Sequence, residues 1–258
     1  MERKYKETVA VIIPLYNSEK FMIKTINSVL NQTYKNFEII LIDDCSNDGT
    51  QAVAKELTKK YNNIIYTSLE NNSGAAVARN KGLEITDARY IAFLDSDDTW
   101  EINKLEEQLY FMEKNKYSFT FSANDIVDGN GNKICSKIKI KEKVTYKDLL
   151  KKTMITTSTV MFDRKILGDL KMPLRRTGQD YAFWLLLLRD TNAYGIDKVI
   201  VHGCRRKNSL SKNKLQNIKD VWDVQTKYER INVLAAGINV LNYCIYALRK
   251  RYCIKGEA

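Results

Sequence analysis

The sequence is poor in the residues that build linkers, metal cages and disulfide frameworks. Among 258 residues there are 2 prolines, 11 glycines and one histidine, His202. So few prolines and glycines give no sign of a flexible linker. A single histidine excludes a histidine-based metal cage and makes Ser-His-Asp or Cys-His catalysis improbable. The five cysteines are scattered without a CxxC pair, which is typical of a reducing cytoplasm and argues against a zinc site.

Two absent motifs narrow the choice of nucleotide-binding fold. No GxGxxG follows the first apolar run, and GxxxxGK[ST] does not occur in the chain. A dinucleotide-dependent dehydrogenase and a P-loop nucleotidase are therefore both disfavoured. The N-terminal stretch MERKYKETVAVIIPLYN also lacks the form of a signal peptide, so we expect a cytoplasmic protein.

The composition is that of an ordinary globular protein, with 44% hydrophobic and 28% charged residues. The length suits one large domain, or one domain with an appendage. The net charge is +11, and residues 201–258 hold 12 Lys or Arg against 4 Asp or Glu. Such a surplus is typical of proteins that meet nucleic acid, anionic lipid or phosphorylated substrates. Its position at the C-terminus favours a surface patch over a channel.

Apolar, strand-like runs alternate with amphipathic, helix-like stretches over the first hundred residues. This β-α-β-α-β-α-β pattern predicts a parallel, doubly wound α/β sheet. The predicted strands are 8–15, 37–42, 63–68 and 90–94, and the predicted helices are 18–30, 51–60 and 73–85. After them we expect a hairpin around Asp128-Gly129-Asn130-Gly131 and a further strand at 158–162.

Polar clusters follow three of the predicted strands: residues 16–19, Asp43-Asp44 and Asp95-Ser96-Asp97-Asp98. In doubly wound sheets, ligands bind outside the carboxyl ends of the strands. If the extended backbone continues, Asp95 and Asp97 point the same way and form a hard-oxygen site for Mg²⁺ or Mn²⁺. The alternative is that Ser96, Asp97 or Asp98 caps a helix starting near Glu101.

The segments VIIPLYNSEKF, SVLNQTYKNFEIILIDDCSNDGT, NSGAAVARNKG and YIAFLDSDDTW occur in this order. Together they resemble the successive signatures of family 2 glycosyltransferases, which have the GT-A fold. The later segments GQDYAFWLLLLRD and RRKNSLSKNK also resemble that family. They are most similar to the bacterial enzymes that build O-antigen, capsule and teichuronic-acid chains. The resemblance covers residues 8–214.

The resemblance implies a set of residues that bind the nucleotide-sugar donor. Within it, Asp44 would accept from the uracil N3–H, and Arg79 would reach a base carbonyl or the acidic cluster. Asp97 would be the direct ligand of Mn²⁺ or Mg²⁺, with Asp95 beside it and toward the ribose. The alternatives are a core position for Tyr16, a turn position for Asp44 and a surface position for Arg79. The implied donor-binding residues are Pro14, Tyr16, Glu19, Asp44, Arg79, Asp95 and Ser96.

The family places its catalytic base at the aspartate that matches Asp180. Many members read Glu-Asp here, so Gln179 departs from the commoner pair. The alternative for Asp180 is a helix cap. The stretch 204–214 resembles a loop that closes over the donor diphosphate, in which some relatives carry histidine where Arg206 stands. Arg206 would instead pair with a phosphate.

Residues 231–248 hold no charged side chain over 18 positions but contain three asparagines, and Arg249-Lys250-Arg251 follow. Leu234, Ile238, Leu241, Ile245 and Leu248 are spaced for one helical face. Two interpretations stay open: a packed or dimerising helix, and a helix lying on an anionic membrane surface. A membrane-spanning helix is the least favoured interpretation, because 18 residues are few for crossing a bilayer and three of them are asparagines.

We therefore expect an inverting glycosyltransferase that moves a sugar from a UDP-sugar to a glycan on a polyprenyl diphosphate lipid. It would act at the inner membrane face, as a peripheral protein or a homodimer, and would not bind nucleic acid. Residues 1–214 would form the catalytic domain, with a nucleotide half at 1–100 and an acceptor half at 101–214, and 215–258 would form C-terminal helices. The rivals are a nucleotidyltransferase and a basic nucleic-acid-binding module.

Overall fold

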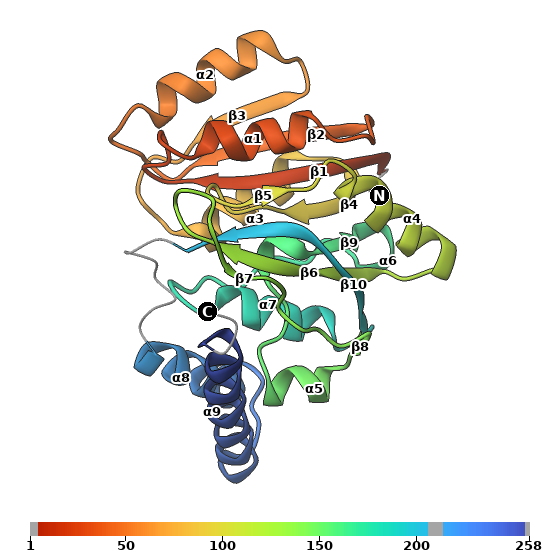
Figure 1. Ribbon diagram of the computed structural model, residues 1–258, viewed down its shortest axis with the longest axis vertical. Coiled ribbons are helices and arrows are strands. Elements are labelled where there is room, and N and C mark those ends of the chain that lie inside the picture. Colours follow the sequence, from red (N-terminus) through yellow and green to blue (C-terminus); the bar gives the residue numbers. More distant parts are fainter. Residues whose placement is uncertain (1–4, 206–213, 256–258) are drawn as a thin grey trace.

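A single sheet with helices on both faces forms the body of the molecule in the computed structural model (Figure 1). The structure describes the backbone of residues 5–205 and 214–255, and the side chains of residues 5–205 and 214–247. The strands are β1 (Lys6–Leu15), β2 (Phe37–Asp43), β3 (Ile64–Ser68), β4 (Ala88–Phe93), β5 (Thr99–Trp100), β6 (Phe119–Val127), β7 (Lys133–Cys135), β8 (Lys143–Val144), β9 (Met161–Asp163) and β10 (Ala193–Cys204). The helices are α1 (Met22–Leu30), α2 (Thr50–Lys60), α3 (Ala75–Ile85), α4 (Lys104–Asn115), α5 (Tyr146–Lys151), α6 (Arg164–Leu167), α7 (Gln179–Leu187), α8 (Lys214–Asp223) and α9 (Val233–Lys255).

The first half of the sheet is parallel, in the order β3-β2-β1-β4. The short strand β9 lies antiparallel between β4 and β6, and β6 continues in parallel with β10. The prediction of a mainly parallel, doubly wound sheet is confirmed. Because β9 joins the two halves, residues that flank it contact both of them.

The apolar run of β1 is continuous because both of its faces are buried. Val9, Val11 and Ile13 pack with the residues of α1, α2 and α4. Ala10 and Ile12, which point the other way, pack with the residues of α3 and α7. This alternation is the two-residue period of a strand, and it explains why no polar residue interrupts the run.

The second half differs in detail from the sequence expectations. The hairpin is confirmed, since β6 pairs antiparallel with β7 and the amide of Asp128 donates to the carbonyl of Asn132. The strand expected at 158–162 is shorter, because Thr157–Thr159 form a 3₁₀ turn and the strand begins only at Met161. In that turn the hydroxyl of Thr159 donates to the carbonyl of Thr156 at 2.7 Å.

The C-terminal helices extend from the end of the molecule that carries α5 and α7 (Figure 1). One face of α9 packs inward, where Asn239 is buried and Val240 and Tyr243 contact the core. The opposite face is apolar and 42–79% exposed, which is unusual for such side chains. We call it the α9 stripe, and its members are Leu234, Ile238, Leu241 and Ile245. Within the described residues, no helix has the length and apolar character needed to cross a membrane.

Candidate active site

The loops that follow β1 and β2 are bound to each other by side-chain hydrogen bonds. The amide of Asn17 donates to Ser46 Oγ at 2.9 Å, and the amide of Ser18 donates to Thr50 Oγ1 at 2.8 Å. Glu19 Oε2 accepts from the amide of Gly49 at 3.1 Å. These bonds hold the carboxyl ends of the two strands together, which is where ligands of doubly wound sheets bind.

The expected nucleoside residues lie at this edge, in different surroundings. Tyr16 is 51% exposed, so it is not a core aromatic. Asp43 accepts from the hydroxyl of Ser46 at 2.5 Å and so stabilises the loop after β2. Asp44 is 4% exposed and binds the backbone before α3, accepting from the amides of Ser73 at 2.6 Å and Gly74 at 2.8 Å. A carboxylate has about four acceptor sites, so Asp44 keeps capacity for a further donor.

Residues 95–98 form a turn and do not continue the extended backbone. The amide of Asp98 donates to the carbonyl of Asp95 at 3.1 Å. Asp95 and Asp97 are nevertheless both half-buried, whereas Ser96 and Asp98 are buried. The helix-cap interpretation is wrong, because β5 follows the turn and α4 begins only at Lys104.

Asp98 is the buried centre of this turn. Its Oδ2 accepts from Ser158 Oγ at 2.5 Å, and its Oδ1 accepts from the amide of Cys204 at 2.8 Å. Burial, together with the negative charges of Asp95 and Asp97, raises the pKa of Asp98 to about 8. The turn therefore brings three carboxyl groups together at the edge of the sheet, and burial favours the protonated form of the innermost one, Asp98.

Arg79, on α3, contacts the turn formed by residues 95–98, which we call the acidic turn. Its Nη2 lies 2.5 Å from Asp95 Oδ1, and its guanidinium lies 5.7 Å from the centroid of the Phe93 ring. The sequence predicts that Arg79 reaches a base carbonyl or the acidic cluster, and in the structure it contacts the acidic cluster. Nε and Nη1 are buried without a hydrogen-bond partner in the described part of the chain. Two donors thus remain for an acceptor group at this site.

Asp180 lies in the first turn of α7, near the acidic turn. Its Oδ2 accepts from Thr157 Oγ1 at 3.3 Å, and its Oδ1 accepts from the amide of Tyr181 at 2.8 Å. Thr157 directly precedes Ser158, which also accepts from the amide of Asp95 at 3.1 Å. Two consecutive residues therefore connect Asp180 with the acidic turn, although the two are far apart in the sequence.

The acidic turn suits a divalent cation in its ligand chemistry. Carboxylate oxygens are the ligands that Mg²⁺ and Mn²⁺ prefer, and a cation would offset the repulsion that raises the pKa of Asp98. Over residues 5–205 and 214–247, no three His, Cys, Asp or Glu side chains converge into a metal cage. Arg206, foreseen as a phosphate contact, lies outside the described residues.

Two residues that contact Asp180 and the acidic turn, Thr157 and Ser158, are not predicted from the sequence. Both are buried, at 6% and 0% exposure. They stand in the stretch TTSTV, whose composition is typical of an ordinary strand. No spacing or motif in the sequence relates them to residues 95–98, so only the fold reveals their role.

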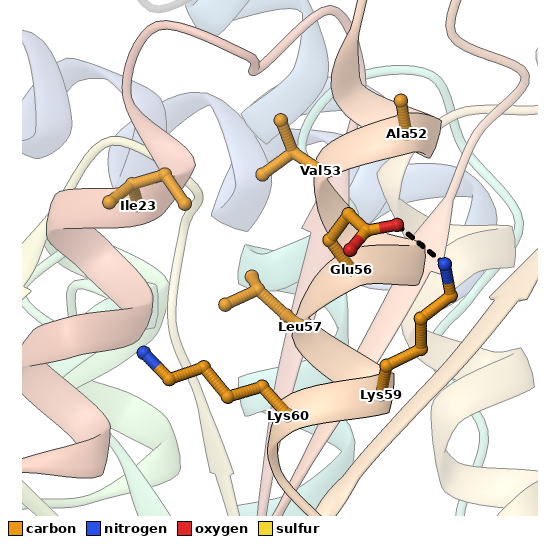
Figure 2. Close-up of a pocket in the computed structure, with 7 residues that line it drawn as sticks. All are labelled: Ile23, Ala52, Val53, Glu56, Leu57, Lys59 and Lys60. Carbon is orange, nitrogen blue, oxygen red and sulfur yellow. Dashed lines mark hydrogen bonds and ion pairs between the residues drawn. The ribbon is translucent and has the colours of Figure 1, made fainter.

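A shallow apolar groove elsewhere on the surface is not part of this site. Figure 2 shows it between α1 and α2, where Ile23, Val53 and Leu57 face one another and Glu56 pairs with Lys59. The groove lies between the outward sides of two helices. Neither the carboxyl ends of the strands nor the acidic turn, where the polar side chains described above lie, lines this groove.

A mainly parallel sheet with an acidic turn at its carboxyl edge, and a carboxylate at the nearby start of a helix, define a glycosyltransferase of the GT-A fold. The chain belongs to glycosyltransferase family 2, because residues 10–170 match the model of that family, "Glycosyl transferase family 2". The family resemblance seen in the sequence is thereby confirmed. Both rivals, a nucleotidyltransferase and a nucleic-acid-binding module, are set aside.

Two relatives are similar over nearly the whole chain. TuaG of Bacillus subtilis (strain 168), whose name assigns it to teichuronic acid biosynthesis, is 41% identical over 96% of this chain and 98% of its own. WfgD of Escherichia coli is 38% identical over 94% of each chain. Its name is UDP-Glc:alpha-D-GlcNAc-diphosphoundecaprenol beta-1,3-glucosyltransferase.

Solved structures share the fold at low sequence identity. The TarS 1-349 structure of S. aureus with UDP-GlcNAc has a TM-score of 0.70 and 20% identity, and the match covers 96% of this chain and 70% of that one. Mannosyltransferase PcManGT of Pyrobaculum calidifontis, in complex with GDP-Man and Mn2+, also has a TM-score of 0.70, at 15% identity. That match covers 100% of this chain and 76% of PcManGT.

Ser158→Ala tests whether this serine holds the acidic turn. The substitution removes the donor to Oδ2 of the buried Asp98 and the acceptor of the Asp95 amide, while the Cys204 amide still donates to Asp98 Oδ1. The loss should lower the free energy of unfolding by about 1–3 kcal/mol. Ser122→Ala is the matched control, because Ser122 is 1% exposed and its Oγ has no hydrogen-bond partner among the described residues. Urea unfolding of both variants is the measurement. Equal effects would contradict a special role for Ser158.

Proposed function

We propose that this glycosyltransferase moves a sugar from a UDP-sugar, with inversion, to a glycan carried on a polyprenyl diphosphate lipid in surface polysaccharide synthesis. The observation that carries the proposal is the link from Asp180 through Thr157-Ser158 to the acidic turn. This link supports the proposal, because it connects the proposed proton acceptor with the proposed site for the diphosphate. The names of TuaG and WfgD support the polysaccharide class and the lipid-linked acceptor.

The nucleoside is proposed to bind at the joined loops after β1 and β2. Pro14 and the exposed ring of Tyr16 would line the base, and Asp44 would accept from the uracil N3–H. The free N–H groups of Arg79 would donate to an oxygen of the nucleotide. Glu19 would act on the ribose side, although it also fixes the start of α2 through the amide of Gly49.

Asp97 and Asp95 are the proposed ligands of Mn²⁺ or Mg²⁺, with Ser96 supporting the turn between them. When bound, the cation neutralises charge on the departing diphosphate. Two carboxylates leave room for phosphate oxygens and water in the coordination shell. Ser96 lies on the buried side of the turn, where its hydroxyl is 2.8 Å from Ser18 Oγ, and this contact links the turn to the loop after β1.

Asp180 is the proposed base. Its carboxylate takes the proton from the acceptor hydroxyl while that oxygen attacks the anomeric carbon. The new glycosidic bond forms as the bond from the anomeric carbon to the diphosphate oxygen breaks, and UDP leaves from the opposite side. Inversion follows, because a single displacement is made with no covalent intermediate on the enzyme.

The reaction is tested directly by a donor screen. UDP-Glc, UDP-Gal, UDP-GlcNAc and UDP-GalNAc are each incubated with a short polyprenyl-diphosphate-linked sugar, and UDP release and product mass are measured. Acceptor-dependent transfer from one of them is expected. Absence of transfer from all four would contradict the proposal.

Asp97→Ala tests the cation site. The variant should weaken UDP binding in Mn²⁺ and lower turnover by orders of magnitude, since a protein ligand of the cation is lost. Calorimetric titration with UDP, with and without EDTA, measures the binding. Full activity of the variant, or of the wild type in excess EDTA, would show that the acidic turn has another task.

Asp180→Asn separates the base from donor binding. Asparagine keeps the size and much of the hydrogen bonding of the side chain but cannot accept the proton. UDP affinity should stay near that of the wild type while transfer falls by about 10²-fold or more. A parallel fall of UDP affinity would identify Asp180 as a structural cap.

We also propose that the α9 stripe lies on the anionic membrane that carries the acceptor. Its apolar side chains are exposed, and the basic run Arg249-Lys250-Arg251 follows it in the sequence. Apolar contact and positive charge together are what an interfacial helix needs. The active site would then work beside the membrane surface, where a lipid-linked sugar is found.

Changing Arg249, Lys250 and Arg251 to Gln should loosen binding to anionic vesicles by roughly two decades, at about 1 kcal/mol per basic residue. Ile238→Ser with Leu241→Ser should weaken it as well, whereas transfer to a water-soluble acceptor should persist. Co-sedimentation with phosphatidylglycerol vesicles at low and high salt is the measurement. No binding by the wild type, together with dimers in light scattering, would make the stripe a contact between two copies.

A further inference from the structure

The start of the base-bearing helix α7 is held by a carboxylate from the C-terminal helices. Asp220, on α8, is 5% exposed and lies against residues 175–178. Its Oδ1 accepts from Thr177 Oγ1 at 2.9 Å and lies 3.4 Å from Arg175 Nη2. Gln216, one turn earlier on α8, also donates to this oxygen at 3.0 Å. Asp220 thus accepts from three donors, two of which belong to the loop that precedes α7.

The backbone of this loop is shaped around Asp220. Gly178 has a φ of +68°, in the left-handed region that favours glycine. A Cβ added to Gly178 would lie 2.9 Å from Asp220 Cβ, so that no side chain fits between them. Gly178 is also the N-cap residue of α7, and its carbonyl accepts from the amide of Ala182 at 3.1 Å. The position of Asp220 therefore bears directly on the first turn of α7.

A second buried contact ties the same helices to the residue after Asp180. Gln225, in the π-helical turn Val224–Tyr228, is fully buried. Its amide nitrogen donates to the hydroxyl of Tyr181 at 2.9 Å and to the carbonyl of Leu150 at 2.8 Å. Asn239 of α9 donates to the Gln225 amide oxygen at 3.0 Å. The C-terminal helices thus contact residues that come before and after Asp180 in the chain, at the start of α7.

The carboxylate of Asp180 itself has few fixed contacts. Within the described residues these are the amide of Tyr181, next to it in the chain, and Thr157 Oγ1 at the long distance of 3.3 Å. A base must be held within hydrogen-bond reach of the proton that it takes, and a displacement of about 1 Å can cost on the order of 10²-fold in rate. The placement of Asp180 therefore depends on what holds the loop before it.

We propose that Asp220 is a positioning residue for Asp180, so that the C-terminal helices are part of the catalytic apparatus. The inference rests on the proposed function, because it takes Asp180 as the base. Asp220 touches no reacting atom. It acts through Thr177, Arg175 and the close approach to Gly178, which together set where the first turn of α7 begins.

The test compares Asp220→Ala with Glu229→Ala. Both carboxylates come from the C-terminal segment, are nearly buried, and bind one arginine and one hydroxyl. For Glu229 these are Arg189 Nη2 at 2.9 Å and the hydroxyl of Tyr146 at 2.6 Å, neither of which belongs to the loop before α7. Asp220→Ala should lower kcat about 10-fold or more while donor KM and UDP affinity stay within about two-fold. Glu229→Ala should lose similar thermal stability and keep kcat.

A second pair of variants examines the hydrogen bond by itself. Thr177→Ser keeps the hydroxyl and should retain most of kcat, whereas the nearly isosteric Thr177→Val should lose it in part. Combining Thr177→Val with Asp220→Ala should lower kcat no further than Asp220→Ala alone, because both changes remove the same contact. This pair also serves if Asp220→Ala does not fold.

Amide hydrogen exchange provides a readout that needs no activity. Exchange over residues 175–182 should quicken in Asp220→Ala and stay at the wild-type rate in Glu229→Ala. If Asp220→Ala keeps kcat, or if Glu229→Ala lowers kcat as much at equal loss of stability, the proposal is wrong. Failure of the wild type to transfer any sugar would instead overturn the proposed function, and the exchange data would still decide whether Asp220 holds the loop.

Discussion

The burial of Asp98 is the constraint on which the site depends. A carboxylate in the interior is costly unless hydrogen bonds compensate it. Here the compensation comes from the hydroxyl of Ser158 and the amide of Cys204, which belong to separate parts of the second half of the chain. The acidic turn can therefore take its shape only when both halves of the sheet are assembled. Asp95 and Asp97, which are half-buried, take their positions from this arrangement.

The segment before β9 also explains why the proposed donor site and the proposed base are connected. The 3₁₀ turn Thr157–Thr159 precedes β9, the strand that joins the two halves. The hydroxyl of Ser158 donates to Asp98 in the acidic turn, and the hydroxyl of the preceding residue, Thr157, donates to Asp180. Since neighbouring Cα atoms are about 3.8 Å apart, this turn sets a short distance between the two groups. A small segment to which no catalytic role is assigned thus organises the proposed site.

Much of the fold could be predicted from the sequence, because its signals are local. The continuous apolar runs of β1 and β2 and the amphipathic stretches between them predict a parallel sheet, and that prediction is confirmed. The helix expected near Glu101 begins instead at Lys104, after the short strand β5, and Asp98 is no cap. The stretch expected as a strand at 158–162 is partly a 3₁₀ turn, in which the hydroxyl of Thr159 bonds the local backbone.

By itself the sequence determined the fold class, the family and the residues that carry charge at the strand ends, because periodicity and short motifs are written within a few residues. Only the tertiary structure decided which groups those residues meet. Asp98 finds Ser158 60 positions away and Cys204 106 positions away, and Thr177 finds Asp220 43 positions away. Such contacts arise from sheet order and helix packing, and buried polar groups accept whichever partner the fold brings within reach. No local pattern records them.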